Sequence, residues 1–174
     1  TISAPSGTIR YTTDRSMPTA TSILYSGPIT LSVNSTIKAR VFQNGVFPSQ
    51  VVAHNYIFLD GTSAGFNSNL PLLIISTEGQ AIAPNVPSGQ PRTKGAVALI
   101  DTARGRSSLQ GATEFQGLAE LELYGQTSIG FPKPPVRIEL QDAYGNDMKV
   151  PLLGMPADSD WKLRNPFDDK TLLN

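Results

Sequence analysis

The sequence predicts a mainly β protein, in which a small β-sandwich precedes a second strand-rich unit. Gly and Pro account for 15 and 14 of the 174 residues, and both interrupt helices. Short stretches alternate apolar and polar residues with the period of a β-strand, and turn formers separate them. Charged residues make up only 16 % of the chain, and 14 basic side chains balance 14 acidic ones. This balance gives no indication of a nucleic-acid partner.

The first unit, residues 1–59, reads as short strands joined by turns. In the segment 36–42, the period of two places Ile37 and Ala39 on one face and Lys38 on the other. About 60 residues of such strands fit a small β-sandwich with a marginal core. The predicted strands are 8–12, 29–33, 36–42 and 50–58.

Four motifs of the first unit carry a resemblance: Ile9–Asp14, Pro18-Thr19, Leu24–Ile29 and Thr36–Ala39. In this order and spacing they resemble the chitobiase/β-hexosaminidase C-terminal type of module, also called fibronectin type III-associated. Arg15 departs from the pattern, because the module usually has Gly after the Asp. The departure implies a different turn within the same β fold.

A linker over residues 60–66 is rich in turn formers and leads into the second unit. That unit, residues 67–174, also reads as strands, with a polar, Pro-rich loop over 79–95 and a turn over 142–147. From Asp168 onward the pattern indicates the first turn of a helix. The predicted strands are 69–77, 96–101, 119–124 and 136–140.

Four motifs of the second unit carry another resemblance: Asn67–Pro71, Phe131–Lys133, Leu152–Trp161 and Asp168–Leu172. They are similar to the N-terminal part of CotH kinase-like domains, a family named after spore coat protein H. The Gly-Met-Pro-Ala-Asp-Ser-Asp-Trp stretch is the most specific of them. The resemblance implies that residues 67–174 are the strand-rich N-terminal part of a kinase-like α+β domain.

This resemblance implies a function for the complete parent protein. CotH domains resemble protein kinases and are expected to transfer phosphate from ATP with magnesium. The family's catalytic and metal-binding Asp residues lie downstream of Asn174, so we expect the fragment alone to be inactive, without catalytic residues or a metal site. The module order is that of secreted or cell-surface multidomain bacterial proteins.

The resemblance also indicates a loop for the phosphates of ATP, between the strands 119–124 and 136–140. Glycines let backbone amides approach phosphates, and hydroxyl and ammonium groups donate to them. The family usually has Arg before the first glycine and two Lys after Phe-Pro, whereas this chain has Tyr124 and Pro134. An ordinary hairpin loop with a solvated lysine is the alternative. The candidate residues are Gly125, Thr127, Ser128 and Lys133.

Asp158, Asp160 and Trp161 have two interpretations. Two carboxylates two residues apart in an extended segment share a side and could hold a hard cation. Alternatively, Asp160 fixes a turn and Trp161 packs in the core.

Aromatic and acidic side chains on the predicted strands also have two interpretations each. Tyr11, Tyr25 and Tyr56 could form a platform for sugars, or could be core and rim residues. Glu120 and Glu122 share one face of a strand, either as a glycosidase pair or as solvent-facing residues.

A kinase-like domain cut within its sheet would lack the helices that cover the sheet. We therefore expect six apolar side chains to point into a core that this chain does not supply. These residues are Val97, Leu99, Leu121, Leu123, Ile138 and Leu140.

Two functions remain open for the parent protein. The first is a secreted or surface phosphotransferase that uses ATP and magnesium. The second is a structural or adhesive surface protein with a degenerate kinase-like domain, in which the β-module is a spacer or binds carbohydrate. Surface proteins, coat proteins or glycans are the expected partners. No apolar run reaches the roughly 20 residues that span a bilayer.

Overall fold

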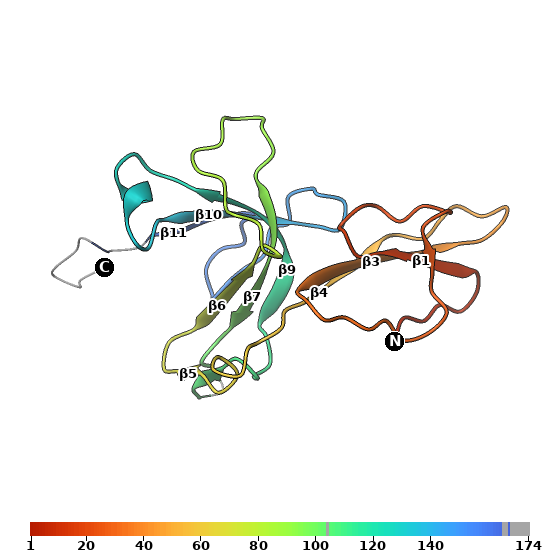
Figure 1. The fold of residues 1–174 in the computed structure, drawn as a ribbon, viewed down its shortest axis with the longest axis horizontal. Helices are drawn as coiled ribbons and strands as arrows, with labels where there is room; N and C mark the ends of the chain where they lie inside the picture. The colour runs from red at the N-terminus through yellow and green to blue at the C-terminus, as the bar shows by residue number, and fades with distance from the viewer. Residues whose placement is uncertain (104, 165–166, 168–174) are drawn as a thin grey trace.

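The structure, a computed structural model, describes residues 1–103, 105–164 and 167. Within these residues the chain is built from antiparallel sheets (Figure 1), so the predicted mainly β class is confirmed. One short 3-10 helix, η1, covers Ser128–Gly130. The helix expected from Asp168 onward lies outside the described residues. Among the residues that are described, no helix is long and apolar enough to cross a membrane.

The first sheet has four strands in the order β2-β1-β3-β4, each antiparallel to its neighbours. Residues 1–59 thus contribute one sheet, where the sequence predicted a sandwich of two. The expected strand over 29–33 does not form. Tyr25 N still donates to Ile9 O at 2.9 Å, but Pro28 follows and has no N–H to extend the ladder. The strands are β1 (Thr8–Thr12), β2 (Ile23–Leu24), β3 (Ser35–Phe42) and β4 (Val52–Tyr56).

The second sheet has five strands in the order β11-β10-β9-β7-β6, again antiparallel. Four of them correspond to predicted strands with shifted boundaries, and β11 lies where a turn was one of the interpretations. A short ribbon of β5 (Asn67–Ser68) and β8 (Ser107–Ser108) completes the unit. The five strands are β6 (Leu72–Ser76), β7 (Thr93–Ile100), β9 (Phe115–Leu123), β10 (Val136–Gln141) and β11 (Asp160–Leu163).

One face of the second sheet is apolar and forms the main core. The register places Leu121 opposite Ile138, with Val97 on the same face, and their side chains are at most 2 % exposed. Leu152 comes from the loop after β10 and packs onto this cluster, as does Trp161 from β11. Burying such side chains contributes about 1.5–3 kcal/mol each.

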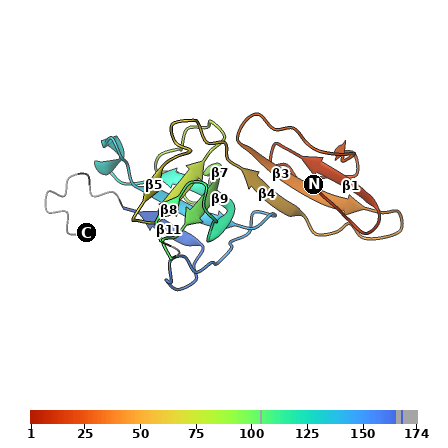
Figure 2. The same cartoon turned by 90° about the horizontal axis from the view of Figure 1, so that it is seen from below.

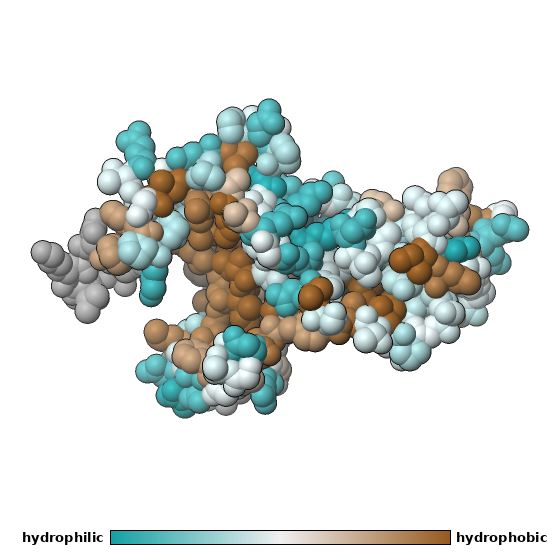
Figure 3. All heavy atoms as spheres, viewed as in Figure 1, coloured by the Kyte–Doolittle hydropathy of each residue, from teal (hydrophilic) through white to brown (hydrophobic). Residues whose placement is uncertain are grey.

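The expectation of a core outside this chain was wrong for most of the six apolar side chains. Five of them are buried in the cluster formed by this chain, and Leu123 is half-buried. The reason is that Leu152 of the loop after β10 packs on this face, and that Trp161 of the edge strand β11 extends the apolar cluster. Part of the face stays open as an apolar cavity of about 160 Å³ near Leu73 and Met155. Figure 3 shows this apolar surface in brown.

The opposite face of the sheet is polar where β9 and β10 meet. Arg92 donates from Nε to Glu122 at 2.8 Å and from Nη1 to Glu139. The Arg92 and Glu122 side chains are 16 % and 8 % exposed. Glu120 and Glu122 do share this face, as predicted, but Glu122 is neutralised by Arg92 instead of facing solvent.

The first sheet is joined to the second near β9 (Figures 1 and 2). Three hydrogen bonds connect the units here: Gln116 Nε2 to Asn55 O at 2.6 Å, Lys38 Nζ to Ala143 O at 2.7 Å, and Val51 N to Tyr144 Oη at 2.9 Å. A second group of contacts surrounds the end of β6: Thr36 Oγ1 to Glu78 Oε1 at 2.8 Å, Asn34 Nδ2 to Ser76 Oγ at 3.2 Å, and the ion pair of Arg15 with Glu78 at 3.0 Å. The linker over residues 60–66 is therefore accompanied by direct contact between the units.

Candidate functional site

The predicted phosphate loop lies between β9 and β10 and contains η1. Gly125 has φ +117°, and a Cβ at this position would collide with Ser128 Oγ, so the turn requires glycine. Gly125 N donates to Asn85 Oδ1 at 3.2 Å, and Asn85 Nδ2 donates to Gly125 O at 3.0 Å. The glycine amide that was expected to face a phosphate is thus bonded to a side chain.

Within the described residues, no hydrogen bond or ion pair brings the other candidate side chains of the loop together. Thr127 is exposed, and its carbonyl accepts from Gly130 N at 3.1 Å. Lys133 is exposed and forms no ion pair within the described residues. Sequence reasoning missed Lys162 of β11, whose Nζ lies 5.6 Å from the ring centroid of Tyr124 at the start of the loop.

The Asp-Ser-Asp-Trp segment leads into β11, and its two carboxylates have different hydrogen-bond partners. Asp158 Oδ1 accepts from the N–H groups of Ser159 and Asp160, at 2.8 and 3.3 Å. The carboxylate of Asp160 accepts from Arg137 Nη2 at 2.7 Å. Trp161 donates to Asp158 O at 3.1 Å and packs on the core, which agrees with the structural interpretation.

The three tyrosines of the first sheet form two groups and not one platform. Tyr11 and Tyr25 meet edge to face with ring centroids 6.3 Å apart. Tyr25 Oη accepts from Ile2 N at 3.1 Å, which ties the start of the chain to the sheet. Tyr56 instead contacts His54 on β4, with centroids 4.9 Å apart.

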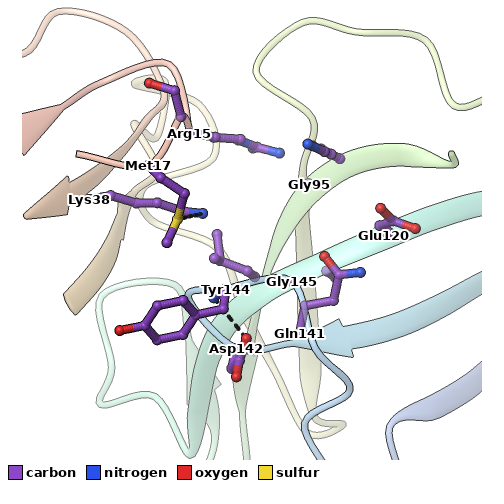
Figure 4. A pocket seen from close by; sticks show the side chains of 13 residues that line it. Arg15, Met17, Lys38, Gly95, Glu120, Gln141, Asp142, Tyr144 and Gly145 are labelled. Carbon is purple, nitrogen blue, oxygen red and sulfur yellow. Dashed lines mark hydrogen bonds between the residues drawn. The ribbon is translucent and has the colours of Figure 1, made fainter. Parts of the chain in front are cut away.

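A cavity between the two units was not predicted. It has a volume of about 400 Å³, and we call it the inter-unit pocket (Figure 4). Arg15, Met17 and Lys38 reach into it from the first unit, while Glu120 and Gln141 face them from β9 and β10. This volume falls within the range of about 300–1,000 Å³ that is common for small-molecule sites.

The electrostatics of the inter-unit pocket are dominated by Lys38. Lys38 is only 7 % exposed, and its Nζ donates a hydrogen bond to Ala143 O. Burial lowers the pKa of Lys38, and the charges of Lys94 and Arg15 lower it further, against an opposing effect of Asp142. Three cations therefore crowd one cavity.

The turn after β10 supplies the opposite wall. Asp142 accepts from the N–H groups of Tyr144 and Asn146 at 2.8 and 2.9 Å. Hydrogen bonds from Asn146 lead the effects that lower the pKa of Asp142, so its carboxylate stays charged. The turn was predicted from its Asp, Gly and Asn residues, but its contact with Lys38 was not. No local pattern reveals a partner 105 residues away.

Comparison with known proteins gives a family match over the first part of the chain. The family model described as Fn3 associated matches residues 1–56. This match supports the β-module that the first resemblance indicated, over the region of the first sheet. The chain has no match among curated proteins or among solved structures.

Proposed function

We propose that the chain is a non-catalytic β region of a secreted or cell-surface multidomain protein. Its role is to hold the Fn3-associated module in a fixed orientation on a second β unit, as part of a structural or adhesive surface. The match over residues 1–56 supports a multidomain protein of the extracellular type. Surface proteins, coat proteins or glycans are the partners that fit this role.

The observation that carries this proposal is the buried charge between the units. Lys38 Nζ lies 2.7 Å from Ala143 O, so the ammonium of one unit depends on the main chain of the other. Burying an ammonium costs several kcal/mol unless it is well bonded. Two units on a freely flexing linker would leave Lys38 in water. The enclosed position therefore supports a fixed arrangement.

The phosphate loop supports a structural role for this chain on its own. Both backbone groups of Gly125 are bonded to Asn85, and Lys133 lies in solvent. We expect no phosphate transfer when the chain is incubated with labelled ATP, magnesium and candidate acceptor proteins. Labelling that disappears in Lys133→Ala would contradict this expectation.

The location of the parent protein is tested on intact cells that make it. A membrane-impermeant amine reagent should modify exposed lysines such as Lys133 without cell lysis. Modification only after lysis would contradict a surface location.

A second candidate function concerns the complete parent protein. We propose that it is a bacterial CotH kinase-like phosphotransferase that binds ATP and magnesium. The supporting observation is Lys162, which brings a cation to Tyr124, where the family usually has Arg. Its ammonium would partly replace the missing guanidinium at the phosphate side of the loop.

This candidate requires a chain that extends beyond Asn174. ATP with magnesium should raise the melting temperature of the extended protein, because a ligand that binds only the folded state stabilises it. Lys162→Met should reduce that shift, whereas Lys94→Met should leave it unchanged. No shift with ATP and magnesium would favour the degenerate, structural alternative.

A further inference from the structure

We propose that the inter-unit pocket binds an acidic saccharide, a hydroxyl-rich sugar that carries a carboxylate. This inference rests on the adhesive role in the proposed function, and it names the class of ligand that the protein would bind. The pocket lies where β3 and the segment 15–17 of the module meet β7, β9 and the turn after β10 (Figure 4).

The first support is an excess of positive charge in the lining of the pocket, where Arg15, Lys38 and Lys94 outnumber the acidic residues Glu120 and Asp142. Lys38 is bonded to a neutral carbonyl, and Lys94 is exposed and forms neither an ion pair nor a hydrogen bond in the described part of the chain. Arg15 forms an ion pair with Glu78 at 3.0 Å, and its Nε and Nη2 are buried, so Lys38 and Lys94 are the cations that a ligand would meet. A bound carboxylate would relieve the mutual repulsion of these cations.

The second support is a pair of polar side chains beside the cations. Glu120 is half-buried and lies directly across from Lys94 in the register of β7 and β9. Gln141 is half-buried beside it, and both line the pocket. A carboxylate and an amide accept hydrogen bonds from hydroxyl groups. The lining therefore offers cations to an acid group and acceptors to the hydroxyl groups of the same ligand.

The third support is Tyr144 at the edge of the pocket. Its hydroxyl accepts from Val51 N at 2.9 Å, so the ring is held in place, and 46 % of the residue remains exposed. A fixed, exposed aromatic ring offers an apolar surface to the C–H face of a sugar.

The same groups argue against two simpler ligands. Inorganic phosphate is a mixture of the mono- and dianion at neutral pH, and Glu120 and Asp142 would repel the dianion more than a single carboxylate. A neutral sugar would not balance the excess positive charge of the lining.

The inference is tested by NMR titration of the whole chain with D-glucuronate and D-galacturonate. D-glucose, D-galactose and inorganic phosphate are the comparison ligands. We expect saturable shifts of the Lys38, Gln141 and Tyr144 amides with at least one uronate, at a Kd of about 1 mM. Binding should weaken as salt is added, because exposed charges are screened.

Lys94→Gln is the decisive variant, because the exposed Lys94 ammonium forms no ion pair or hydrogen bond within the described residues. It should weaken uronate binding about tenfold, roughly the loss of one charge-assisted contact. Lys133→Gln, at an exposed lysine of the β9–β10 loop, should bind like the wild type. Neither variant should lower the melting temperature of the chain.

Several outcomes would overturn the inference. They are the absence of saturable shifts, equal binding of glucose or phosphate, and an unchanged Kd in Lys94→Gln. If uronates do not bind while the two units still unfold together, only the ligand inference fails. If the units unfold separately, the fixed arrangement proposed above fails as well.

Discussion

Lys38 carries a charge into the contact between the two sheets, and this makes stability depend on pH. Its folded-state pKa is lowered from 10.5, chiefly by burial and then by Lys94 and Arg15. Between the lowered pKa and 10.5, the unfolded chain binds more protons than the folded one, so stability rises with pH. The penalty is fully present below the lowered pKa and is lost above 10.5.

The first prediction compares the wild type with Lys38→Met. As pH rises from 7 towards the ordinary lysine pKa, the free energy of unfolding of the wild type should increase relative to that of the variant. Urea unfolding at several pH values measures this difference. The prediction is wrong if this difference does not change with pH, or if the wild type loses stability relative to Lys38→Met as pH rises. Either result would show that burial does not lower the pKa of Lys38.

Arg92 is the second residue whose charge is committed to the fold. It bridges Glu122 and Glu139, and Arg92→Met would leave the Glu122 carboxylate without a cation and Glu139 with only Arg137 at 3.9 Å. We predict a loss of about 3–5 kcal/mol in the free energy of unfolding. Arg137→Met is the matched control, since its partner Asp160 is 43 % exposed, and it should cost less than about 1 kcal/mol. Equal losses in urea unfolding would contradict the difference in burial.

At the scale of elements, the alternation of apolar and polar residues predicted strands well where one face of the strand is buried and the other is polar. The strand Thr8–Thr12 has the predicted bounds, and Val136–Gln141 is one residue longer than predicted. The segment 29–33 alternates equally well but pairs with no other strand in the described part of the chain, and Pro28 precedes it. Periodicity reports which face is apolar, and it does not report whether a partner strand is within reach.

The predicted phosphate loop shows the same limit for a site. Glycines and hydroxyls identified the loop from sequence, but the contact with Asn85 comes from a segment 40 residues away. Asn85 has φ +43°, a conformation that Asn tolerates better than most residues. Neither fact is visible in the local motif, so Asn85 was missed.

Asn85 gives a prediction for this loop. Asn85→Asp keeps the acceptor for Gly125 N, whereas Asn85→Gly keeps the backbone conformation and removes the side chain. We expect Asn85→Gly to cost about 1 kcal/mol and to speed hydrogen exchange of the Gly125 amide. Asn85→Asp should protect that amide nearly as well as the wild type does. Unchanged exchange in Asn85→Gly would mean that the side chain does not hold the loop.

At the scale of the whole molecule, sequence similarity indicated the module but not its docking. The contacts between the units join Lys38 to Ala143 O and Gln116 to Asn55 O, across 105 and 61 residues. Main-chain acceptors carry no sequence signal, because every residue has the same carbonyl. The period of two correctly placed Lys38 on the other face of the strand from Ile37 and Ala39. It could not show that the second unit covers the face that carries Lys38.

The docking predicts that the two units unfold as one. Tyr144→Phe removes the acceptor for the N–H of Val51, a residue that is only 6 % exposed, and should cost about 1–3 kcal/mol. Tyr124→Phe is the control, because the Tyr124 hydroxyl forms no hydrogen bond within the described residues. Trp161 is the one tryptophan of the chain and reports on the second sheet, while amide signals of β3 report on the first. Both probes should lose their signals at the same urea concentration in the wild type, and both should shift together in Tyr144→Phe. If the β3 amides disappear at a lower urea concentration than the Trp161 signal in the wild type, the units are independent and their contact does not stabilise the fold.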